Sequence, residues 1–498
     1  MNLIQLEKPA PTGVLASFKF AFSSPQRLRT EVLAGLVVGL ALIPESIAFS
    51  VLAGVDPRMG LFASCIMAMT IAFTGGRPAM ISAATGAVAL VIAPVVKLYG
   101  VDYFLATIML AGIFQIALAI LGVAKLMRFI PRSVMLGFVN ALAALVFMAQ
   151  LPHLFNVPWM VYPLFAAGIL IMLGWPKLTK AIPAPLIVII ALTALVWIFN
   201  ISIPNVADQG ELPQTLPEFI LPQVPLNLET LSIIAPYALG MALVGLMESL
   251  LTAKLVDDIT EVHSNKSREA AGQGIANILT SLLGGMGGCA MIGQTMINVK
   301  NSGARTRLST FLAGAFLLIL VVVLGDIVGK IPMAALVAVM IIVAIDTADW
   351  HSLSPRTLRL MPLSETLVMV VTIVATLGTS NLAIGVISGV LTAMVMFARR
   401  VAHLVSVEHS SSGGISTYAV KGQLFWASSN DLVYSFNYSD PAAEIIIDLS
   451  AAEIWDASTV ATLDSIIQKY KARGKKVGII GLDGPSLERL EKLTGKLG

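Results

Sequence analysis

The sequence is poor in charge and in the residues that most often carry chemistry. Charged residues make up 12% of the 498 residues, and there are only two cysteines and five histidines. A soluble domain usually carries about 25% charged residues, so most of this chain is not expected to fold in water. The two cysteines lie far apart in apolar segments, which excludes a disulfide framework and a metal-ligand spacing. We expect Cys65 and Cys289 to be buried as small hydrophobic side chains.

Motifs for enzymatic chemistry are missing from the apolar part as well. The glycine run at 284–288 lacks the following lysine of a P-loop, no nucleophile elbow occurs, and the histidines are not grouped as metal ligands. A net charge of +3 is too small to indicate a nucleic-acid-binding surface. We therefore expect no enzyme activity, no metal site, no organic cofactor and no nucleic-acid partner.

Hydrophobic residues are abundant, at 57% of the chain with a mean hydropathy of +0.86. They form about fourteen runs, some shorter than the roughly 20 residues that a straight membrane span requires. The first seven runs lie near 31–52, 60–74, 79–97, 103–123, 133–151, 161–174 and 184–200. The second seven lie near 231–253, 270–284, 289–299, 308–328, 332–346, 363–379 and 382–398. This pattern predicts a polytopic α-helical membrane protein in contact with lipid.

The two sets of runs have the features of a repeat. The short, glycine-interrupted runs 79–97 and 289–299 hold equivalent places, and each contains the tripeptide Ala-Met-Ile, at 79–81 and at 290–292. Such paired short segments are typical of discontinuous helices that meet at a binding site in mid-membrane. With seven spans per half, the halves enter the membrane in opposite directions. We predict a 7+7 inverted repeat, with repeats at about 31–200 and 231–400.

The basic residues predict the orientation. The connection 201–230 has no lysine or arginine but carries four acidic residues, so the positive-inside rule makes it external and both termini cytoplasmic. The basic positions on the opposite side are Lys125, Arg128, Arg132, Lys177, Lys180, Lys254, Lys266, Arg268, Arg356, Arg359, Arg399 and Arg400. Residues 1–30 are polar and lack the apolar core of a signal peptide. We expect a cytoplasmic N-terminus and a location in the bacterial cytoplasmic (inner) membrane.

The composition changes after Arg400. Residues 401–414 are predicted to be a polar linker, and residues 415–498 have the pattern of a small cytoplasmic α/β domain. We predict strands at 415–425, 444–449 and 476–482, and helices at 458–473 and 486–493. About eighty residues are enough for such a domain to fold.

Two glutamates stand in apolar sequence, Glu45 in the first run and Glu248 at the start of the second half. A carboxyl group in hydrocarbon is costly and is usually functional, which makes both candidates for binding a coupling ion. The alternative is that each is a neutral carboxyl hydrogen-bonded to backbone for structural reasons.

The ends of the two discontinuous helices are the candidate substrate site. Helix N-termini present unpaired N–H groups and a partial positive charge, which bind anions. The residues predicted at these ends are Ala84, Thr85, Gly86, Ala87, Gly293, Gln294 and Thr295. The alternative is that these small residues only allow close helix packing. Phe49 lies one turn after Glu45 and either lines the same pocket or packs in the core. Arg77 either attracts anions or, as we favour, is a loop or interface arginine.

Several motifs resemble those of the sulfate permease (SulP) family of anion transporters, bacterial type, whose members carry a C-terminal STAS domain. The matching stretches are Pro44–Phe49, Leu52–Leu61, Thr85–Ala89, Glu248–Ser249, Gly303–Thr306, Gly422–Phe425, Asp448–Ser450 and Asp456–Ser458. The resemblance implies two intertwined seven-span repeats that form a core domain and a gate domain, a homodimer, and transport by elevator-type alternating access.

The chain departs from the family at two positions of the expected site. Many members have glutamine where this chain has Glu45, and many have Ser-Arg where it has Gln294-Thr295. The site thus loses a fixed positive charge and gains a titratable carboxyl group, which would repel a bound anion unless it were protonated. We therefore expect proton–anion symport with Glu45 as the proton-binding group. Glu248 is the second candidate for the coupling ion, either a proton or Na⁺.

Three function classes remain open. The leading one is a secondary active transporter of a small anion, a dicarboxylate or sulfate, with Na⁺-coupled bicarbonate or sulfate symport as an alternative. The second is an uncoupled anion channel of the same fold, and the third is a membrane scaffold for partners of the tail. The tail is expected to contact a cytoplasmic regulator, and Ser458 is predicted to N-cap the helix after it rather than to be phosphorylated.

Overall fold

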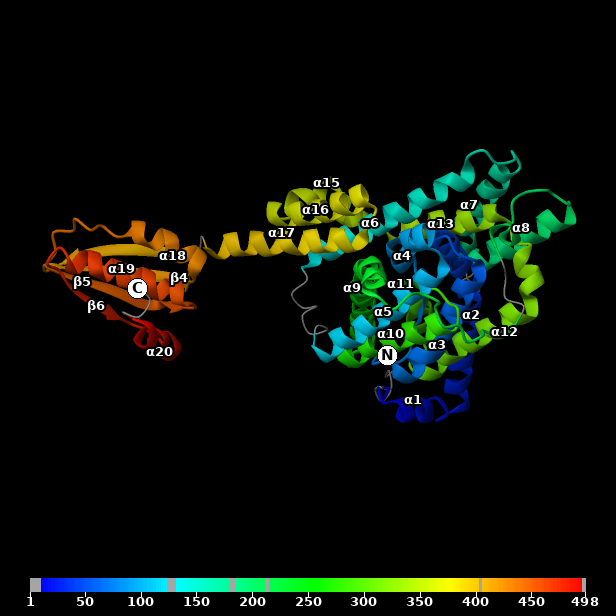
Figure 1. The fold of residues 1–498 in the computed structure, drawn as a ribbon, viewed down its shortest axis with the longest axis horizontal. Helices are drawn as coiled ribbons and strands as arrows, with labels where there is room; N and C mark the ends of the chain where they lie inside the picture. The colour runs from blue at the N-terminus through cyan, green and yellow to red at the C-terminus, as the bar shows by residue number, and fades with distance from the viewer. Residues whose placement is uncertain (1–9, 123–130, 179–183, 211–214, 403–404, 495–498) are drawn as a thin grey trace, which may run out of the picture. The chain divides into compact units, whose positions relative to one another are not determined.

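The structure is a computed structural model that describes residues 10–122, 131–178, 184–210, 215–402 and 405–494. Lys125, Arg128 and Lys180, which the orientation argument used, lie outside these residues. The chain divides into two compact units, Met1–Val390 and Leu391–Gly498, and the division falls within one helix. Each unit is described by itself (Figure 1).

The first unit consists of two helical bundles. In the core bundle, the packed helices are α2 (Pro25–Ala53), α3 (Pro57–Thr74), α4 (Gly86–Tyr99), α5 (Val101–Ile120), α9 (Leu228–Thr260), α10 (Lys266–Leu282), α11 (Ile292–Met296) and α12 (Arg307–Gly329). In the gate bundle they are α6 (Arg132–Gln150), α7 (Val161–Leu178), α8 (Ala184–Ile198), α13 (Met333–Thr347), α16 (Leu363–Thr379) and α17 (Leu382–Ala402). The remaining elements of this unit are short: α1 (Val14–Ala21), η2 (Leu151–Leu154), η3 (Val206–Gln209), the π-helical η4 (Ile297–Asn301), α14 (Trp350–Leu353) and α15 (Pro355–Leu360).

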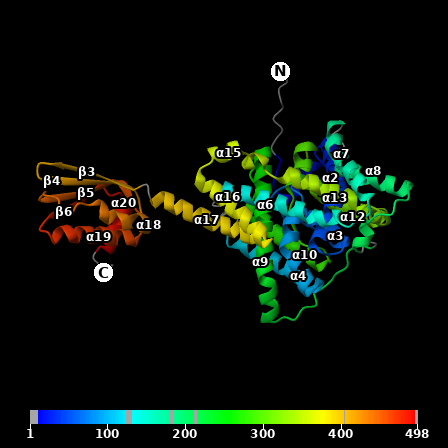
Figure 2. The ribbon, with the colours of Figure 1, turned by 90° about the horizontal axis from the view of Figure 1, so that it is seen from above.

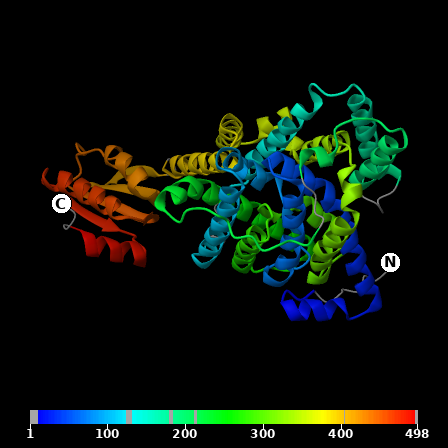
Figure 3. The ribbon, with the colours of Figure 1, turned by 45° about the vertical axis from the view of Figure 1, so that its right-hand side comes forward.

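The helix contacts have the symmetry of an inverted repeat. α2 packs on α12 as α9 packs on α5, α3 on α12 as α10 on α5, and α6 on α16 as α13 on α7. Each of these contacts joins the first half of the chain to the second, and the blue-to-cyan and green-to-yellow helices interleave accordingly in Figures 1 and 3. The predicted intertwined repeats are therefore present.

Glycines allow some of these helices to approach closely. A Cβ on Gly112 of α5 would lie 2.6 Å from the carbonyl oxygen of Gly274 in α10, and a Cβ on Gly274 would lie 2.5 Å from that of Gly112. The reciprocal pair shows that only glycine fits at either position. This is the close backbone contact that small residues permit in membrane helices.

Local signals account for the ends of the longest helices. The Ser24 hydroxyl accepts a hydrogen bond from Arg27 N–H at the start of α2, and Gly54 ends that helix with φ of 78°. The Asn227 side chain caps α9 by accepting from Thr230 N–H at 2.8 Å. Both devices satisfy backbone groups that a helix leaves unpaired at its termini.

Two short strands, β1 (Ser82–Ala84) and β2 (Gly288–Ala290), cross in the middle of the core bundle. They pair antiparallel, with Ala83 opposite Cys289, and α4 and α11 begin two residues after β1 and β2 respectively. The sequence reading predicted the interrupted segments but not the strands. The prediction that the two Ala-Met-Ile tripeptides hold equivalent places was wrong. Ala79–Ile81 precedes β1, whereas Ala290 is the last residue of β2. Equivalent residues differ by 206, which pairs Thr85 with Met291.

All fourteen predicted runs coincide with a helix or with a strand followed by a helix. Among the described residues, seven helices are long and apolar enough to cross a membrane, and five apolar helices are shorter. The number of spans thus stays a prediction. The connection after α8 is tied to the start of α13 through an Asn205–Pro332 bridge and a Val206 N–H bond to the carbonyl of Ile331 at 2.9 Å.

The second unit contains a four-stranded sheet in the order β3-β4-β5-β6 (Figure 2). The strands are β3 (Ser406–Ser412), β4 (Ile415–Leu424), β5 (Glu444–Ile454) and β6 (Lys476–Ile480), with β3 antiparallel to β4 and the other pairs parallel. The helices are α18 (Trp426–Leu432), α19 (Ala457–Lys471) and α20 (Gly484–Leu493), with a short turn η5 (Val433–Ser435).

The predicted linker 401–414 was wrong over 406–412, which form β3. This edge strand is polar and almost wholly exposed, so it has no alternating apolar pattern to reveal it. The predicted strands and helices after residue 414 are all present, and α18 was missed. The apolar side of the sheet, with Ile445 and Ile447, packs with Leu463 and Ile466 of α19 in one hydrophobic core.

Candidate functional site

A cavity of about 1220 Å³ lies between the core and gate bundles. Eight of the ten predicted site residues line it: Glu45, Phe49, Thr85, Gly86, Ala87, Glu248, Gly293 and Gln294. They come from α2, β1–α4, α9 and α11, and thus from both halves of the chain. The fold therefore brings together residues that are up to 249 positions apart.

The first carboxyl group, Glu45 of α2, contacts the discontinuous helix of the other half. Nε2 of Gln294 donates a hydrogen bond to Oε1 of Glu45 at 2.6 Å. Both side chains are buried, with 8% and 2% of their surface exposed. The Oε1 atom of Gln294 is also buried but has no hydrogen-bond partner among the described residues. The amide is therefore half satisfied, which is uncommon for a buried polar group.

The second carboxyl group, Glu248 of α9, is part of a chain of three side chains. The Cys289 thiol donates to Oε2 of Glu248 at 3.0 Å, and the Thr85 hydroxyl lies 3.1 Å from the same sulfur. Because the thiol has one proton, the Thr85 hydroxyl is the donor in the second contact. Cys289 is buried as expected, but it is a polar link between the two half-sites rather than only a small hydrophobic side chain.

The N-terminal end of α4 faces the cavity. Thr85 is the residue before the helix, yet its side chain does not cap it, because the hydroxyl is used by Cys289. Gly86 and Ala87, in the first turn, line the cavity, and N–H groups of a first turn have no partner within the helix. A Cβ on Gly86 would lie 2.8 Å from the ring of Phe49, so glycine at this position leaves room for the ring.

Ala84 and Thr295 do not line the cavity. Ala84 is in β1, and its N–H donates to the Ser64 hydroxyl at 3.2 Å. The Thr295 hydroxyl accepts from Ile81 N–H at 3.0 Å, which fixes α11 to the segment before β1. Ala84 and Thr295 therefore hold β1 and α11 in position without lining the cavity.

The charges at the cavity are all of one sign. Its described lining includes the buried Glu45 and Glu248, Asp346 near the C-terminal end of α13 and Asp349 just after that helix, but no lysine, arginine or histidine. Asp346 is exposed. An anion in this cavity would meet helix N–H groups and neutral donors, and no fixed positive side chain. Among the described residues no group of three possible metal ligands occurs.

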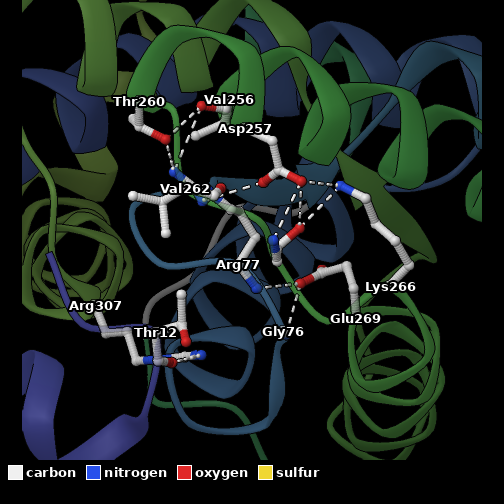
Figure 4. Close-up of polar contacts among 11 residues, drawn as sticks. Thr12, Gly76, Arg77, Val256, Asp257, Thr260, Val262, Lys266, Glu269 and Arg307 are labelled. Atoms are coloured by element: carbon white, nitrogen blue, oxygen red, sulfur yellow. Dashed lines mark hydrogen bonds and ion pairs between the residues drawn. The ribbon is translucent and has the colours of Figure 1, made fainter. Parts of the chain in front are cut away.

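Arg77 is not among the residues that line the cavity, and its own polar contacts are shown in Figure 4. It lies between α3 and β1, forms a buried ion pair with Asp257 at 3.1 Å, and donates to the carbonyl of Val262 at 2.7 Å. Asp257 also pairs with Lys266 at 2.7 Å, and Glu269 accepts the N–H of Arg77 at 2.9 Å. The arginine holds the ends of α9 and α10 to the loop that leads into β1, in line with the interpretation we favoured.

Sequence reasoning missed the other wall of the cavity. It comes from the gate bundle and is apolar, with Phe138, Leu142, Val146 and Ile342 among its residues. Apolar residues in membrane helices carry no individual signal, so only the fold identifies them. Cys289 was also missed as a polar link, because its partners lie 41 and 204 residues away.

The predicted capping role of Ser458 was wrong. Asp456 is the N-cap of α19 and accepts hydrogen bonds from the N–H and hydroxyl of Thr459 at 3.0 and 2.9 Å. Ser458 is in the first turn and is exposed. The N-cap therefore lies two residues earlier than predicted, and the Asp456 carboxylate is favoured at the positive end of the helix.

Intertwined inverted repeats, a central strand crossing and a cavity with two buried carboxyl groups define a membrane transporter fold. The sequence matches the sulfate permease family over residues 28–163 and 155–373, and the STAS domain over residues 406–495. The chain belongs to the sulfate permease family. It is an integral membrane protein and an anion transporter of that family rather than an enzyme.

Individual relatives agree over nearly the full length. The provisionally named sulfate transporter YbaR of Bacillus subtilis (strain 168) is 47% identical over 467 residues, 94% of this chain and 97% of YbaR. The bicarbonate transporter BicA of Picosynechococcus is 23% identical over 522 residues, 94% of this chain and 91% of BicA. The structure of the murine Slc26a9 anion transporter in the inward-facing state is similar with a TM-score of 0.84 at 16% identity, over 96% of this chain and 89% of that one.

Proposed function

We propose that the protein is a secondary active transporter that moves a small anion, a dicarboxylate or sulfate, together with a proton. The observation that carries this proposal is a cavity with two buried glutamates and no cationic side chain in its described lining. The N-terminal turn of α4 and the amide of Gln294 supply donors for an anion.

Electrostatics supports a proton as the coupling ion. A single negative charge about 4 Å from an ionised carboxyl group, at an effective dielectric constant of about 20, is repelled by about 4 kcal/mol. Protonation of Glu45 removes this repulsion, and burial also favours the neutral form, whereas the one hydrogen bond from Gln294 acts in the opposite direction. Proton and anion are then expected to bind together and to leave together.

The arrangement of the two bundles supports elevator-type alternating access. The polar groups around the two glutamates belong to the core bundle, while the gate bundle presents an apolar wall there. A core bundle that slides along such a wall breaks no polar contacts with it. The substrate site would therefore move as one piece.

Na⁺-coupled symport is the second candidate, because Glu248 has its own buried environment with Cys289 and Thr85. The names of the relatives support sulfate and bicarbonate among the substrates to be tested. An uncoupled channel and a scaffold for partners of the tail are the remaining alternatives. We also propose a homodimer in the bacterial inner membrane, with both termini cytoplasmic and a regulator bound by the STAS domain.

Uptake into liposomes tests the proposal. The purified protein is reconstituted, and accumulation of labelled sulfate, bicarbonate, chloride, fumarate and succinate is measured with an inward proton gradient, with an inward Na⁺ gradient, and with neither. Accumulation that requires the proton gradient and is lost in Glu45→Gln is the expected result. Accumulation driven only by Na⁺ and lost in Glu248→Gln selects the second candidate. Equilibration without any gradient contradicts both.

A further inference from the structure

We propose that the Gln294 side-chain amide positions the proton on Glu45 and turns when that proton binds, so that both of its N–H groups become free for the anion only in the protonated state. The inference rests on the proposed function and names the device that couples proton and anion. It makes Gln294 a positioning residue for the proton and a binding residue for the anion.

The half-satisfied amide is the first observation. Nε2 of Gln294 is 2.6 Å from Oε1 of Glu45, whereas Oε1 of Gln294 is buried without a partner among the described residues. An amide has donors at one end and an acceptor at the other, so one of them faces Glu45 and the other stays unpaired in either orientation. The Gln294 amide can therefore face Glu45 in two orientations, which differ by a half-turn and occupy the same space.

The protonation state of Glu45 decides between these arrangements. An ionised carboxyl group only accepts hydrogen bonds, so it holds the N–H end of the amide, as in the structure. A protonated carboxyl group carries one O–H donor, which would pair with the amide oxygen that is unpaired here. A half-turn of the amide group then directs both Nε2 protons away from Glu45.

The surroundings restrict the movement to the amide itself. The neighbouring Thr295 is tied to Ile81 through its hydroxyl, which holds the backbone of α11. On the other side, a Cβ on Gly293 would meet no atom within 4 Å, so no other element packs closely against α11 at the residue before Gln294. Gln294 lines the cavity, and freed N–H groups would join the first-turn N–H groups of α4 as donors to an anion.

The consequence is that the carboxylate and the anion compete for the same donor. While Glu45 is ionised it occupies one of the two amide N–H groups and repels the anion. After a proton from the aqueous side has bound to Glu45, the donor is free and the repulsion is gone. When the proton leaves, the carboxylate takes the donor back and the anion loses a contact. Two effects thus act in the same direction on one side-chain pair.

The other charged groups around Glu45 are few. The titratable groups that share the cavity are Glu248 of α9 and, toward its mouth, Asp346 of α13 and Asp349, and Cys289 of β2 lies behind Glu248. The described titratable side chains on elements that pack against α2 but do not line the cavity are Lys19, Arg58, Cys65, Lys97, Tyr99, Lys300 and Arg307. Among the described residues that line the cavity, no cation is therefore in place to replace the proton.

Infrared difference spectroscopy tests the amide without any substrate. Wild-type protein is titrated from pH 9 to pH 4, and bands of Glu45 and Gln294 are assigned by their loss in Glu45→Gln and Gln294→Met. We expect the Gln294 amide band to shift at the same pH at which the protonated carboxyl band of Glu45 appears, and to stay constant in Glu45→Gln. An amide band that does not move while Glu45 is protonated would overturn the proposal.

Proton-linked uptake is the second measurement, with labelled sulfate and fumarate as probes. In the wild type, the anion concentration for half-maximal uptake is expected to fall by up to about tenfold per pH unit on acidification, the limit for one linked proton. Gln294→Met and the shorter Gln294→Asn lose the contribution of the amide but keep that of charge repulsion, so a smaller slope is expected in both. Gln150→Met, which removes a buried amide of α6 outside the cavity, is the matched control and should keep the wild-type slope.

The two proposals fail in different ways. If the wild type takes up both anions without any dependence on pH, the proposed proton coupling is wrong for them, and the infrared result alone decides about the amide. If the wild type shows the slope and Gln294→Met keeps it unchanged, the coupling stands and the role of Gln294 is wrong.

Discussion

Replacing Arg77 should destabilise the core bundle rather than weaken anion binding directly. Its side chain is 5% exposed, and that of its partner Asp257 is 8% exposed. Removing one member of a buried ion pair typically costs about 3–5 kcal/mol, because the remaining charge stays buried without compensation. The structure shows which of the two substitutions leaves the less compensated buried charge.

The neighbours of the pair set the order of the effects. In Arg77→Met, Asp257 keeps Lys266 at 2.7 Å and the Ser264 hydroxyl at 3.0 Å, so a loss near the lower limit of about 3 kcal/mol is expected. In Asp257→Leu, the guanidinium of Arg77 keeps only neutral partners, such as the carbonyl of Val262, and a loss near about 5 kcal/mol is expected. Lys266→Met should cost about 1 kcal/mol, because that side chain is 29% exposed.

Unfolding of the detergent-solubilised full-length protein, followed by intrinsic fluorescence against heat and SDS, checks the order Asp257→Leu, Arg77→Met, Lys266→Met. Uptake of a transported anion is measured for each variant at a temperature where it stays folded. If Arg77→Met unfolds like the wild type but raises the KM for the anion at low salt only, Arg77 attracts substrate and the structural role is refuted. Equal destabilisation by all three variants would refute the argument from burial.

Three further predictions concern the cavity and the STAS domain. Gly86→Ala should reduce uptake more than Gly293→Ala, because a Cβ at Gly86 would lie 2.8 Å from an aromatic ring and one at Gly293 would meet nothing within 4 Å. Cys289→Ala leaves two buried polar partners unpaired, at about 1–3 kcal/mol, and should raise the KM about tenfold or more in uptake assays. At Asp440, burial raises the pKa, but hydrogen bonds from a backbone N–H and two hydroxyl groups outweigh it and lower the pKa below its usual range. The stability that this carboxylate contributes should be complete above about pH 4 and lost as the pH falls further, measured by hydrogen exchange of residues 406–494 in the full chain.

Each of these predictions has an outcome that contradicts it. Equal uptake by the two alanine variants would mean that the ring of Phe49 moves freely. Cys65→Ala is the control for the thiol, because Cys65 is packed in the hydrophobic core, and an equal effect of both cysteine variants would exclude a polar role for Cys289. Exchange that does not depend on acid pH, or an Asp440→Asn variant with the same acid profile as the wild type, would contradict the assignment at Asp440.

Periodicity and composition were sufficient to locate the helices. Each apolar run became a helix or a strand followed by a helix, because a membrane leaves the backbone few other ways to pair its polar groups. The strands β1 and β2 were not predictable in this way, because three residues are too short to show a period. β3 was missed for a different reason: it is an edge strand of polar residues, and its structure depends on pairing with β4.

Individual residues of the candidate site were predictable where their residue type is rare in the surrounding sequence. Glu45 and Glu248 stand out in hydrocarbon, and glycine or threonine at an interrupted helix suggests a binding site. Contacts between distant segments carry no such signal. The partnership of Gln294 with Glu45 spans 249 residues, and nothing in either local sequence predicts it.

The strand crossing explains how a symmetric scaffold carries an asymmetric site. Because equivalent residues differ by 206, Ala83 corresponds to Cys289, Thr85 to Met291 and Val88 to Gln294. At each of these pairs one half supplies a polar side chain and the other an apolar one. The two carboxyl groups are thus buried to similar extents, 8% and 9% exposed, but one has an amide as its neighbour and the other a thiol. An amide offers a carboxyl group a strong donor and a strong acceptor and can serve it in both protonation states, whereas a thiol is only a weak donor and a weak acceptor. This difference in neighbours, rather than in depth, is the reason to place the exchangeable proton on Glu45.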